Sequence, residues 1–317
     1  EVGGKQQSNL KKRTAEVVVT YNRVEFLKRW VDSLHKQTVP CDILVVDNAS
    51  TDETAQWLES QTDIFFHNTG SNLGGAGGFH YGMRWAIEAN YDYLWVMDDD
   101  CFPKTDALEK LLSADSLLKG VYGWMSSVAL WTDGRECRMN RPKVKKSFYE
   151  HIELLREGVL QAEQATFVSL FLKSETVREV GLPIAEYFIW GDDIEYTRRI
   201  AVRRNYPCYI VGQSQVIHAM KNNNGSNLAL DDIERINRYW YAYRNENYTY
   251  RQEGIKGICY YLARCGKHGT QILLSAKDHR LKRLGVLFQG MISGVGFAPE
   301  VEYVAGTRND AESTIRE

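Results

Sequence analysis

The first hundred residues alternate between short apolar runs and longer amphipathic stretches. The runs EVVVTYN, ILVVD, DIFFHN and YLWVMDDD have the length of strands, and each ends in polar residues. Leu27, Trp30 and Leu34 follow the first run at helical spacing. Ser50 and Glu53 have the spacing of a capping box, which predicts the start of another helix at this point.

Strands that alternate with helices predict a parallel sheet covered by helices on both faces, that is, an α/β fold. In such sheets ligands bind at the carboxyl ends of the strands. Polar clusters follow the four expected strands at 20–22, 47–48, 72–78 and 98–100. We expect them to converge at one edge of the sheet, although loops also begin with polar residues for purely structural reasons.

A glycine-rich segment, NLGGAGGF, occupies residues 72–79 in front of an expected helix. A dinucleotide-binding fold would carry GxGxxG directly after its first strand, and a P-loop would carry GKS or GKT. Neither pattern is present at these places. We expect instead that Asn72, Gly74 and Gly75 allow the backbone to approach a bound nucleotide diphosphate closely.

Three carboxylates, Asp98, Asp99 and Asp100, end the fourth expected strand. Alternate side chains of a strand share a face, so Asp98 and Asp100 can point the same way. Two like charges held together need a cation, and hard oxygen ligands suit Mg²⁺ or Mn²⁺. The alternative interpretation is an acidic loop exposed to water.

The segments VVVTYNR, ILVVDNASTDET, NLGGAGGF and WVMDDD occur in this order and resemble the nucleotide-binding half of the family 2 inverting glycosyltransferases, which have the GT-A fold. The resemblance extends from residue 16 to about residue 220. It implies a nucleotide-sugar donor, a divalent metal at a DxD motif and inversion at the anomeric carbon.

Several residue roles follow from this resemblance. Thr20, Asn22 and Asp47 would line the nucleobase and the ribose. Asp98 would contact the ribose or the sugar and, with Asp100, the metal. Asp99 would lie beside them in the donor site.

A second candidate cluster lies in EYFIWGDDIEY, residues 186–196, in front of an arginine-rich helix. Inverting transfer needs a base that takes the proton of the acceptor hydroxyl, while the metal assists the leaving diphosphate. The resemblance assigns the base to Asp193, with Asp192 and Glu195 as competitors, and helix capping is the structural alternative. Trp190 is a candidate stacking platform for the acceptor sugar, with Asp192 beside it.

His218 ends the strand-like run SQVIH that follows the acidic helix. Relatives that depend on a metal place a third ligand at this point, and imidazole is compatible with Mn²⁺. A lone histidine is otherwise more often structural.

The remainder of the chain reads as helical. We therefore expect a tail at 1–15, a GT-A catalytic domain at 16–225, a helical region at 226–300 and a tail at 301–317. Within the catalytic domain, 16–103 would bind the nucleotide and 104–225 the acceptor. The stretch from His279 to Gln289 is basic and amphipathic, with Lys282 and Arg283 on its basic side. Peripheral contact with an anionic membrane, packing as a subdomain and an oligomer interface are the alternatives.

Composition limits the cellular locations and the classes of partner that we expect. The formal net charge of -2 gives no basic field for nucleic acid. The six cysteines form no CxxC pair, and no apolar run approaches the roughly 18 residues that span a bilayer. We expect a cytoplasmic protein, which would lie at the inner face of the cell membrane if its helices bind there.

The donor sugar is indicated by resemblance alone. NLGGAGGF, WVMDDD and FIWGDDIEY look most like bacterial galactofuranosyltransferases, which implies transfer of galactofuranose from UDP-galactofuranose to a hydroxyl of a cell-surface glycan. The acceptor could be lipid-linked. Transfer of rhamnose from dTDP-rhamnose is the first alternative, and a non-catalytic carbohydrate-binding protein is a remoter one. Only residues 1–15 precede the first expected strand, so we expect addition of single residues rather than polymerisation.

Overall fold

The computed structural model describes residues 12–304, so most of both expected tails lies outside the described residues. The first strand already begins at Thr14. The strands are β1 (Thr14–Thr20), β2 (Asp42–Asp47), β3 (Ile64–Asn68), β4 (Tyr93–Asp98), β5 (Cys101–Pro103), β6 (Trp124–Leu130), β7 (Lys143–Val144), β8 (Val159–Gln164), β9 (Leu170–Lys173) and β10 (Tyr209–His218). The α-helices are α1 (Val24–His35), α2 (Thr54–Glu59), α3 (Gly74–Glu88), α4 (Ala107–Leu117), α5 (Ile152–Arg156), α6 (Ser174–Val180), α7 (Asp192–Arg198), α8 (Tyr239–Arg251), α9 (Gly254–Ser275) and α10 (Arg280–Gly296).

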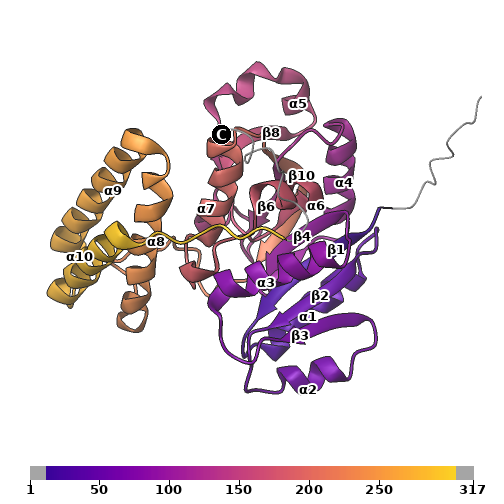
Figure 1. Cartoon of the computed structure of the whole chain (residues 1–317), viewed down its shortest axis with the longest axis horizontal. Coiled ribbons are helices and arrows are strands. Elements are labelled where there is room, and N and C mark those ends of the chain that lie inside the picture. Colours follow the sequence, from indigo (N-terminus) through magenta and orange to yellow (C-terminus); the bar gives the residue numbers. More distant parts are fainter. Residues whose placement is uncertain (1–11, 305–317) are drawn as a thin grey trace, which may run out of the picture.

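One ten-stranded sheet forms the centre of the molecule (Figure 1). Its order is β3-β2-β1-β4-β9-β6-β10-β8-β7, with β5 paired to β10. The first four strands are parallel to one another, as are β6 and β10. In contrast, β9 runs antiparallel to β4 and β6, and β8 and β5 run antiparallel to β10. The expected α/β fold is confirmed, and β1 to β4 form the purely parallel part of the sheet.

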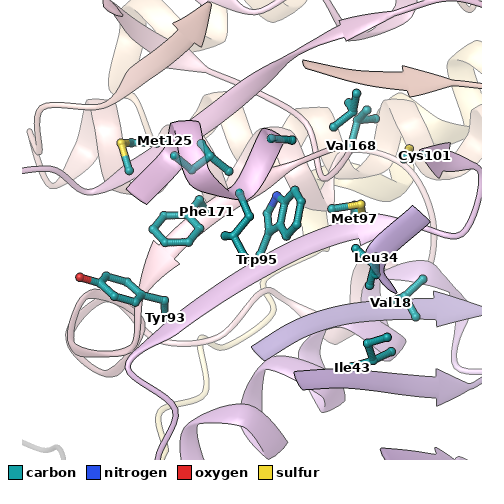
Figure 2. Close-up of a cluster of buried hydrophobic side chains, with 14 of the residues drawn as sticks. Val18, Leu34, Ile43, Tyr93, Trp95, Met97, Cys101, Met125, Val168 and Phe171 are labelled. Atoms are coloured by element: carbon teal, nitrogen blue, oxygen red, sulfur yellow. The ribbon is translucent and has the colours of Figure 1, made fainter. Parts of the chain in front are cut away.

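Strict alternation along the strands explains why helices cover both faces. Val18 of β1 joins the core under α1 and α4, whereas Val17 joins the core under α3, α6 and α7. Trp95 and Val96 divide in the same way along β4. Figure 2 shows part of the first of these cores, and Trp95, Met97 and Phe171 are among its labelled residues. Because both faces are buried, β1 and β4 are mostly apolar, and Glu16 in the middle of β1 is an exception.

The start of the second helix differs from the expected capping box. α2 begins at Thr54, one turn later than Ser50 would place it, and Glu53 makes no side-chain cap. The Asp52 carboxylate accepts a hydrogen bond from the Thr54 N–H at 3.0 Å instead. Ser50 turns to the loop after β1, where its hydroxyl accepts from the Asn22 N–H at 2.9 Å.

Three helices, α8, α9 and α10, group at one end of the molecule, beyond the edge of the sheet domain (Figure 1). They enclose a small core of their own that includes Tyr243, Tyr261 and Leu287. Gly290 lets α10 approach α8 closely, because a Cβ there would lie 2.7 Å from the Tyr243 Cβ. No helix among the described residues is long and apolar enough to cross a bilayer.

The segment after α10 returns to the sheet domain. The Glu302 carbonyl accepts from the Leu182 N–H at 2.8 Å, and the Glu302 carboxylate pairs with Arg84 of α3. The three helices are thus attached to the sheet domain at both of their ends.

Candidate functional site

Strand register places the expected donor residues in a row at the carboxyl edge of the sheet. Thr20 pairs with Asp47, Asp47 pairs with Asn68, and Val19 pairs with Asp98 across β1, β2, β3 and β4. The polar ends of four parallel strands therefore lie side by side, as the alternation of elements predicted.

Asp47 and Asn22 organise the loops around this edge. The buried Asp47 carboxylate accepts from the Ser50 N–H at 3.0 Å and from the Asn68 amide at 2.7 Å. Asn22 has a left-handed backbone (φ 54°), and its side-chain oxygen accepts from the Thr51 N–H at 2.6 Å. Both residues fix the walls of the expected nucleotide site.

The glycine-rich segment forms the first turns of α3 rather than a separate turn. Asn72 accepts from the Gly74 N–H at 2.8 Å, and the buried Asn48 donates to the Gly74 carbonyl at 2.9 Å. These bonds tie the start of α3 to the end of β2. A Cβ at Gly75 would meet no atom within 4 Å, so this position faces open space.

Gly74 instead contacts the loop before α7. It has φ +72°, and a Cβ there would lie 2.0 Å from the Phe188 carbonyl oxygen, which no side chain can do. The same carbonyl accepts from the Ala76 N–H at 3.1 Å. The start of α3 is thereby joined to the loop that carries the acidic pair.

The three consecutive aspartates have different partners. Asp99 is buried, accepts from the Thr20 hydroxyl at 2.7 Å and pairs with Arg23 at 2.8 Å. Asp100 pairs with Arg23 at 3.0 Å and with His218 at 3.2 Å. Burial opposes ionisation of Asp100, but the hydrogen bond and charge of His218, with Arg23, lower its pKa to about 2. Asp99 has fewer such bonds, and burial raises its pKa to about 7.

Asp98 makes no hydrogen bond or ion pair through its side chain with any residue between 12 and 304. Burial, followed by the charge of Asp100, raises its pKa well above the ordinary value. A carboxylate in this environment gains if a cation binds beside it.

Ligand atoms of Asp100, Cys101 and His218 lie within 4.8 Å of one another. Burial raises the pKa of Cys101 and keeps it a thiol, so it is a poor ligand. His218 directs Nε2 to Asp100, and its Nδ1 donates to Asn140 at 2.7 Å, which fixes the ring. Burial acts to lower the His218 pKa, but the bonds to Asp100 and Cys137 raise it to about 10. Carboxylate oxygen with one imidazole suits Mn²⁺, so these residues fit the expected ion.

The acidic pair opens α7 near this cluster. The charge of Asp192 is the smallest of the causes that raise the pKa of Asp98, which is consistent with their proximity. Asp193 accepts from the Ile194 N–H at 2.7 Å and from the Phe167 N–H. Burial is the main cause that raises the pKa of both, and the charge of Asp193 adds to it in Asp192. Glu195 is fully buried between Arg199 and Arg203 and serves the fold rather than the acceptor.

The loop before the pair has an unusual backbone. Phe188 and Trp190, with φ of 61° and 63°, lie in the left-handed region, which costs side-chain-bearing residues energy. The fully buried Asn245 of α8 donates its amide to the carbonyls of Tyr187, Ile189 and Trp190 at 3.0, 3.2 and 2.7 Å. We call this set of three bonds the Asn245 clamp.

Trp190 is only partly available as a stacking platform. Its ring packs edge-on against Tyr239, with ring centroids 4.8 Å apart, and Arg235 lies over its face.

Three residues of the site had no role in the sequence interpretation. Arg23 directly follows the TYN that ends the first strand, so its position could have indicated a partner for carboxylates at the same edge. Asn140 and Asn245 lie far from any recognised segment, in a short 3-10 helix before β7 and in α8. No spacing rule connects them to His218 or to the loop before α7.

The chain is similar in sequence to a known protein family and to a galactofuranosyltransferase. Residues 17–116 match the family described as Glycosyl transferase family 2. The chain is 26% identical over 295 residues to galactofuranosyltransferase GlfT1 of Mycolicibacterium smegmatis, which covers 85% of this chain and 95% of that protein.

Solved structures share the fold at low identity. The structure of GalNAc-T7 with UDP, GalNAc and Mn²⁺ has a TM-score of 0.58 and 14% identity over 77% of this chain, and the chain spans 48% of that structure. Staphylococcus aureus TarS 1-349 with UDP has a TM-score of 0.50 and 12% identity over 90% of this chain and 72% of that one. Residues 17–116 thus match glycosyltransferase family 2, the chain has a GT-A-like fold, and over most of its length it is similar to a galactofuranosyltransferase.

Proposed function

We propose that this transferase moves galactofuranose from UDP-galactofuranose to a hydroxyl of a bacterial cell-surface glycan, with inversion at the anomeric carbon. The observation that carries the proposal is the contact between the start of α3, at the expected donor edge, and the loop before Asp192 and Asp193, where the Ala76 N–H donates to the Phe188 carbonyl at 3.1 Å. A donor bound at the first cluster would present its anomeric carbon to the second. The choice of sugar rests on the relative in Mycolicibacterium smegmatis, which aligns over most of both chains.

Donor binding is assigned to the carboxyl edge of the sheet. Thr20, Asn22 and Asp47 would surround the nucleoside, and the start of α3 would face the diphosphate at Asn72, Gly74 and Gly75. Asp98, Asp100 and His218 would hold Mn²⁺ or Mg²⁺, with Asp99 beside them. Such an ion supplies charge compensation for the diphosphate.

Asp193 is proposed as the base. The acceptor hydroxyl attacks the anomeric carbon as its proton passes to the Asp193 carboxylate, and the bond to the diphosphate oxygen breaks. Asp192 and Trp190 would position the acceptor. Asp192 is also the first competitor for the role of base, because it is the other carboxylate of the pair in the first turn of α7.

A donor panel tests the sugar and the mechanism together. We expect turnover with UDP-galactofuranose and a glycan acceptor, dependence on Mn²⁺ or Mg²⁺, and an inverted anomer by NMR. Asp193→Asn cannot accept the proton, so turnover should fall by at least about 100-fold at unchanged donor affinity. Asp192→Asn should lose less. Preference for dTDP-rhamnose would favour the rhamnosyl alternative, and a product with retained configuration would exclude a single displacement.

Calorimetry with UDP separates an enzyme from a non-catalytic binding protein. Asp100→Ala should lose the part of UDP binding that depends on Mn²⁺, whereas Asp63→Ala, an exposed aspartate after α2, should bind as wild type does. Equal UDP binding by the Asp100 variant in Mn²⁺ would remove the metal assignment.

A further inference from the structure

Two helices of the C-terminal group expose apolar side chains along one stripe each. The stripe on α9 begins with Ile255, which is 80% exposed, and the stripe on α10 begins with Leu281, which is 86% exposed. Successive members of each stripe are three, four, seven or eleven residues apart, and these intervals place them on one face of the helix. The exposed members are Ile255, Ile258, Leu262 and Leu273 on α9, and Leu281, Phe288, Ile292 and Val295 on α10.

The two stripes meet in a groove between the helices. Ile258 and Leu262 of α9 line it opposite Phe288, Ile292 and Val295 of α10, and its volume is about 370 Å³. The lining is almost entirely apolar. A soluble surface rarely keeps apolar side chains contiguous over such a stretch unless something covers them.

The two helices and the segment between them are positively charged. Residues 254–296 contain seven lysines and arginines and a single acidic residue, Asp278, whereas the whole chain has 39 basic and 41 acidic residues. The exposed cations are Lys256, Lys267, Lys277, Arg280 and Lys282. The rest of the chain is correspondingly acidic.

One cation that the sequence assigned to this surface belongs to the interior. Arg283 is 3% exposed and donates to the carbonyls of Leu228 and Asp231 at 2.7 and 2.9 Å. It joins α10 to the segment before α8 and is not available to a partner. The available charge comes from both helices instead of from the stretch between His279 and Gln289 alone.

We propose that the exposed face of α9 and α10 docks on the surface of an anionic phospholipid bilayer. Apolar side chains flanked by lysines and arginines are the combination that inserts at the boundary between headgroups and acyl chains without spanning the bilayer. A second copy of this chain would bring two basic surfaces together, which disfavours it as the occupant. The inference rests on the proposed function in one respect, because docking would bring the site to a lipid-linked acceptor.

Vesicle flotation of the full chain tests the proposal. We expect the chain to float with vesicles of phosphatidylcholine and phosphatidylglycerol in equal parts, to stay with the soluble fraction when phosphatidylcholine is alone, and to be released by high salt. Phe288→Ser with Ile292→Ser should reduce flotation. Lys256→Glu, Lys267→Glu and Lys282→Glu together should reduce it by at least about ten-fold.

Matched controls lie away from this face. Val121→Ser removes an exposed apolar side chain after α4, and Lys36→Glu with Lys146→Glu reverses two exposed lysines of the sheet domain. These variants should float as wild type does. UDP binding of every variant is measured in parallel, so a failure of donor binding is distinguished from a failure of docking.

Two results would overturn the proposal. One is wild-type protein that ignores anionic vesicles, or whose flotation is insensitive to both sets of substitutions. The other is a dimer in analytical ultracentrifugation that Phe288→Ser with Ile292→Ser dissociates, without vesicle binding, which would make a second copy the occupant.

Discussion

Three neighbouring aspartates show how environment assigns roles to one residue type. Asp99 is fixed by Thr20 and Arg23, Asp100 by Arg23 and His218, and Asp98 has no ion pair within residues 12–304. Arg23 offsets part of this charge, which keeps the cluster folded in the absence of an ion. The remaining carboxylate is the one for which a cation brings the largest gain.

The proposed base makes the activity dependent on pH. Burial raises the pKa of Asp193 to about 6, and a base acts only when it is ionised. Turnover should therefore fall as pH decreases through about 6, well above the range of an ordinary aspartate, which is near 4. Turnover measured from pH 5 to 8 at saturating donor gives this limb.

The variants identify the group behind the limb. The two carboxyls interact, so the limb belongs to the pair. Asp192→Asn should keep an acid limb, and the residual activity of Asp193→Asn should be flat over this range. A limb that persists in Asp193→Asn would assign the proton to another group.

Glu16 provides a prediction about stability. It lies in the middle of β1, is 0% exposed, and neither carboxylate oxygen has a hydrogen-bond partner in the described part of the chain. Burial raises its pKa well above 4.5. An acid with a raised folded pKa costs nothing extra below its unfolded pKa and destabilises the fold increasingly as pH rises above it. Glu16→Met should therefore stabilise the protein at pH 8 by at least about 1 kcal/mol, and by less at pH 5.

Denaturant titrations at the two pH values measure this difference. Glu25→Met, on the exposed surface of α1, is the control and should change stability little at either pH. A Glu16 variant that is less stable than wild type at both values would indicate that the carboxylate has a partner when the protein is in solution.

At the scale of elements, the glycines of α3 have separate tasks. Gly75 faces open space at the expected diphosphate, whereas a Cβ at Gly82 would lie 2.5 Å from Val17 of β1. Gly75→Val should weaken UDP binding about ten-fold or more with little change in melting temperature. Gly82→Val should lower the melting temperature because it forces α3 away from the sheet. Equal losses of both properties in the two variants would mean that Gly75 is also structural.

The loop before α7 depends on α8. Asn245→Ala removes all three bonds of the Asn245 clamp, so Phe188 and Trp190 should relax from their left-handed backbone and displace the acidic pair. We expect turnover to fall at least about ten-fold, because small misplacement of a catalytic group is costly. UDP affinity should be retained, and stability should fall by roughly 1–3 kcal/mol.

Asn247→Ala is the matched control for this variant. It lies on the same helix but bonds to the Met291 carbonyl of α10 and to Tyr261 of α9, so its loss leaves the loop before α7 in place. Its kinetics should remain close to those of wild type. If Asn245→Ala lowered stability without a change in turnover, the clamp would support the fold alone.

Whether the sequence predicted a feature depends on how far apart in the chain the interacting residues lie. Alternation in β1 to β4 and the polar ends of these strands are local, so the sequence predicted the sheet edge with Asp47, Asp98 and the glycines. The Asn245 clamp joins Asn245 to Trp190, and another hydrogen bond joins Asn140 to His218. Such contacts depend on how distant elements pack, which no periodicity encodes. The prediction of a capping box was wrong because the Ser50 hydroxyl bonds to the loop after β1 instead.

At the scale of the whole molecule, backbone contacts join the expected donor half to the expected acceptor half. Gly74 lies against the Phe188 carbonyl, and the last described segment pairs Glu302 with Arg84. Figure 1 shows this segment running from α10 back to the sheet domain. The helices that we expect to face the membrane are therefore coupled mechanically to both halves of the site.

The Asn245 clamp has a consequence for recombining this chain with its relatives. A hybrid whose crossover falls between residues 104 and 120 would exchange the donor half and keep the clamp with its own loop. A crossover between residues 191 and 245 would combine the loop of one parent with the α8 of another, and the two would meet correctly only if both parents carry the same amide and the same backbone kink. Hybrids of the first kind should inherit the donor preference of one parent and the acceptor preference of the other, whereas those of the second kind should often bind nucleotide and fail to turn over.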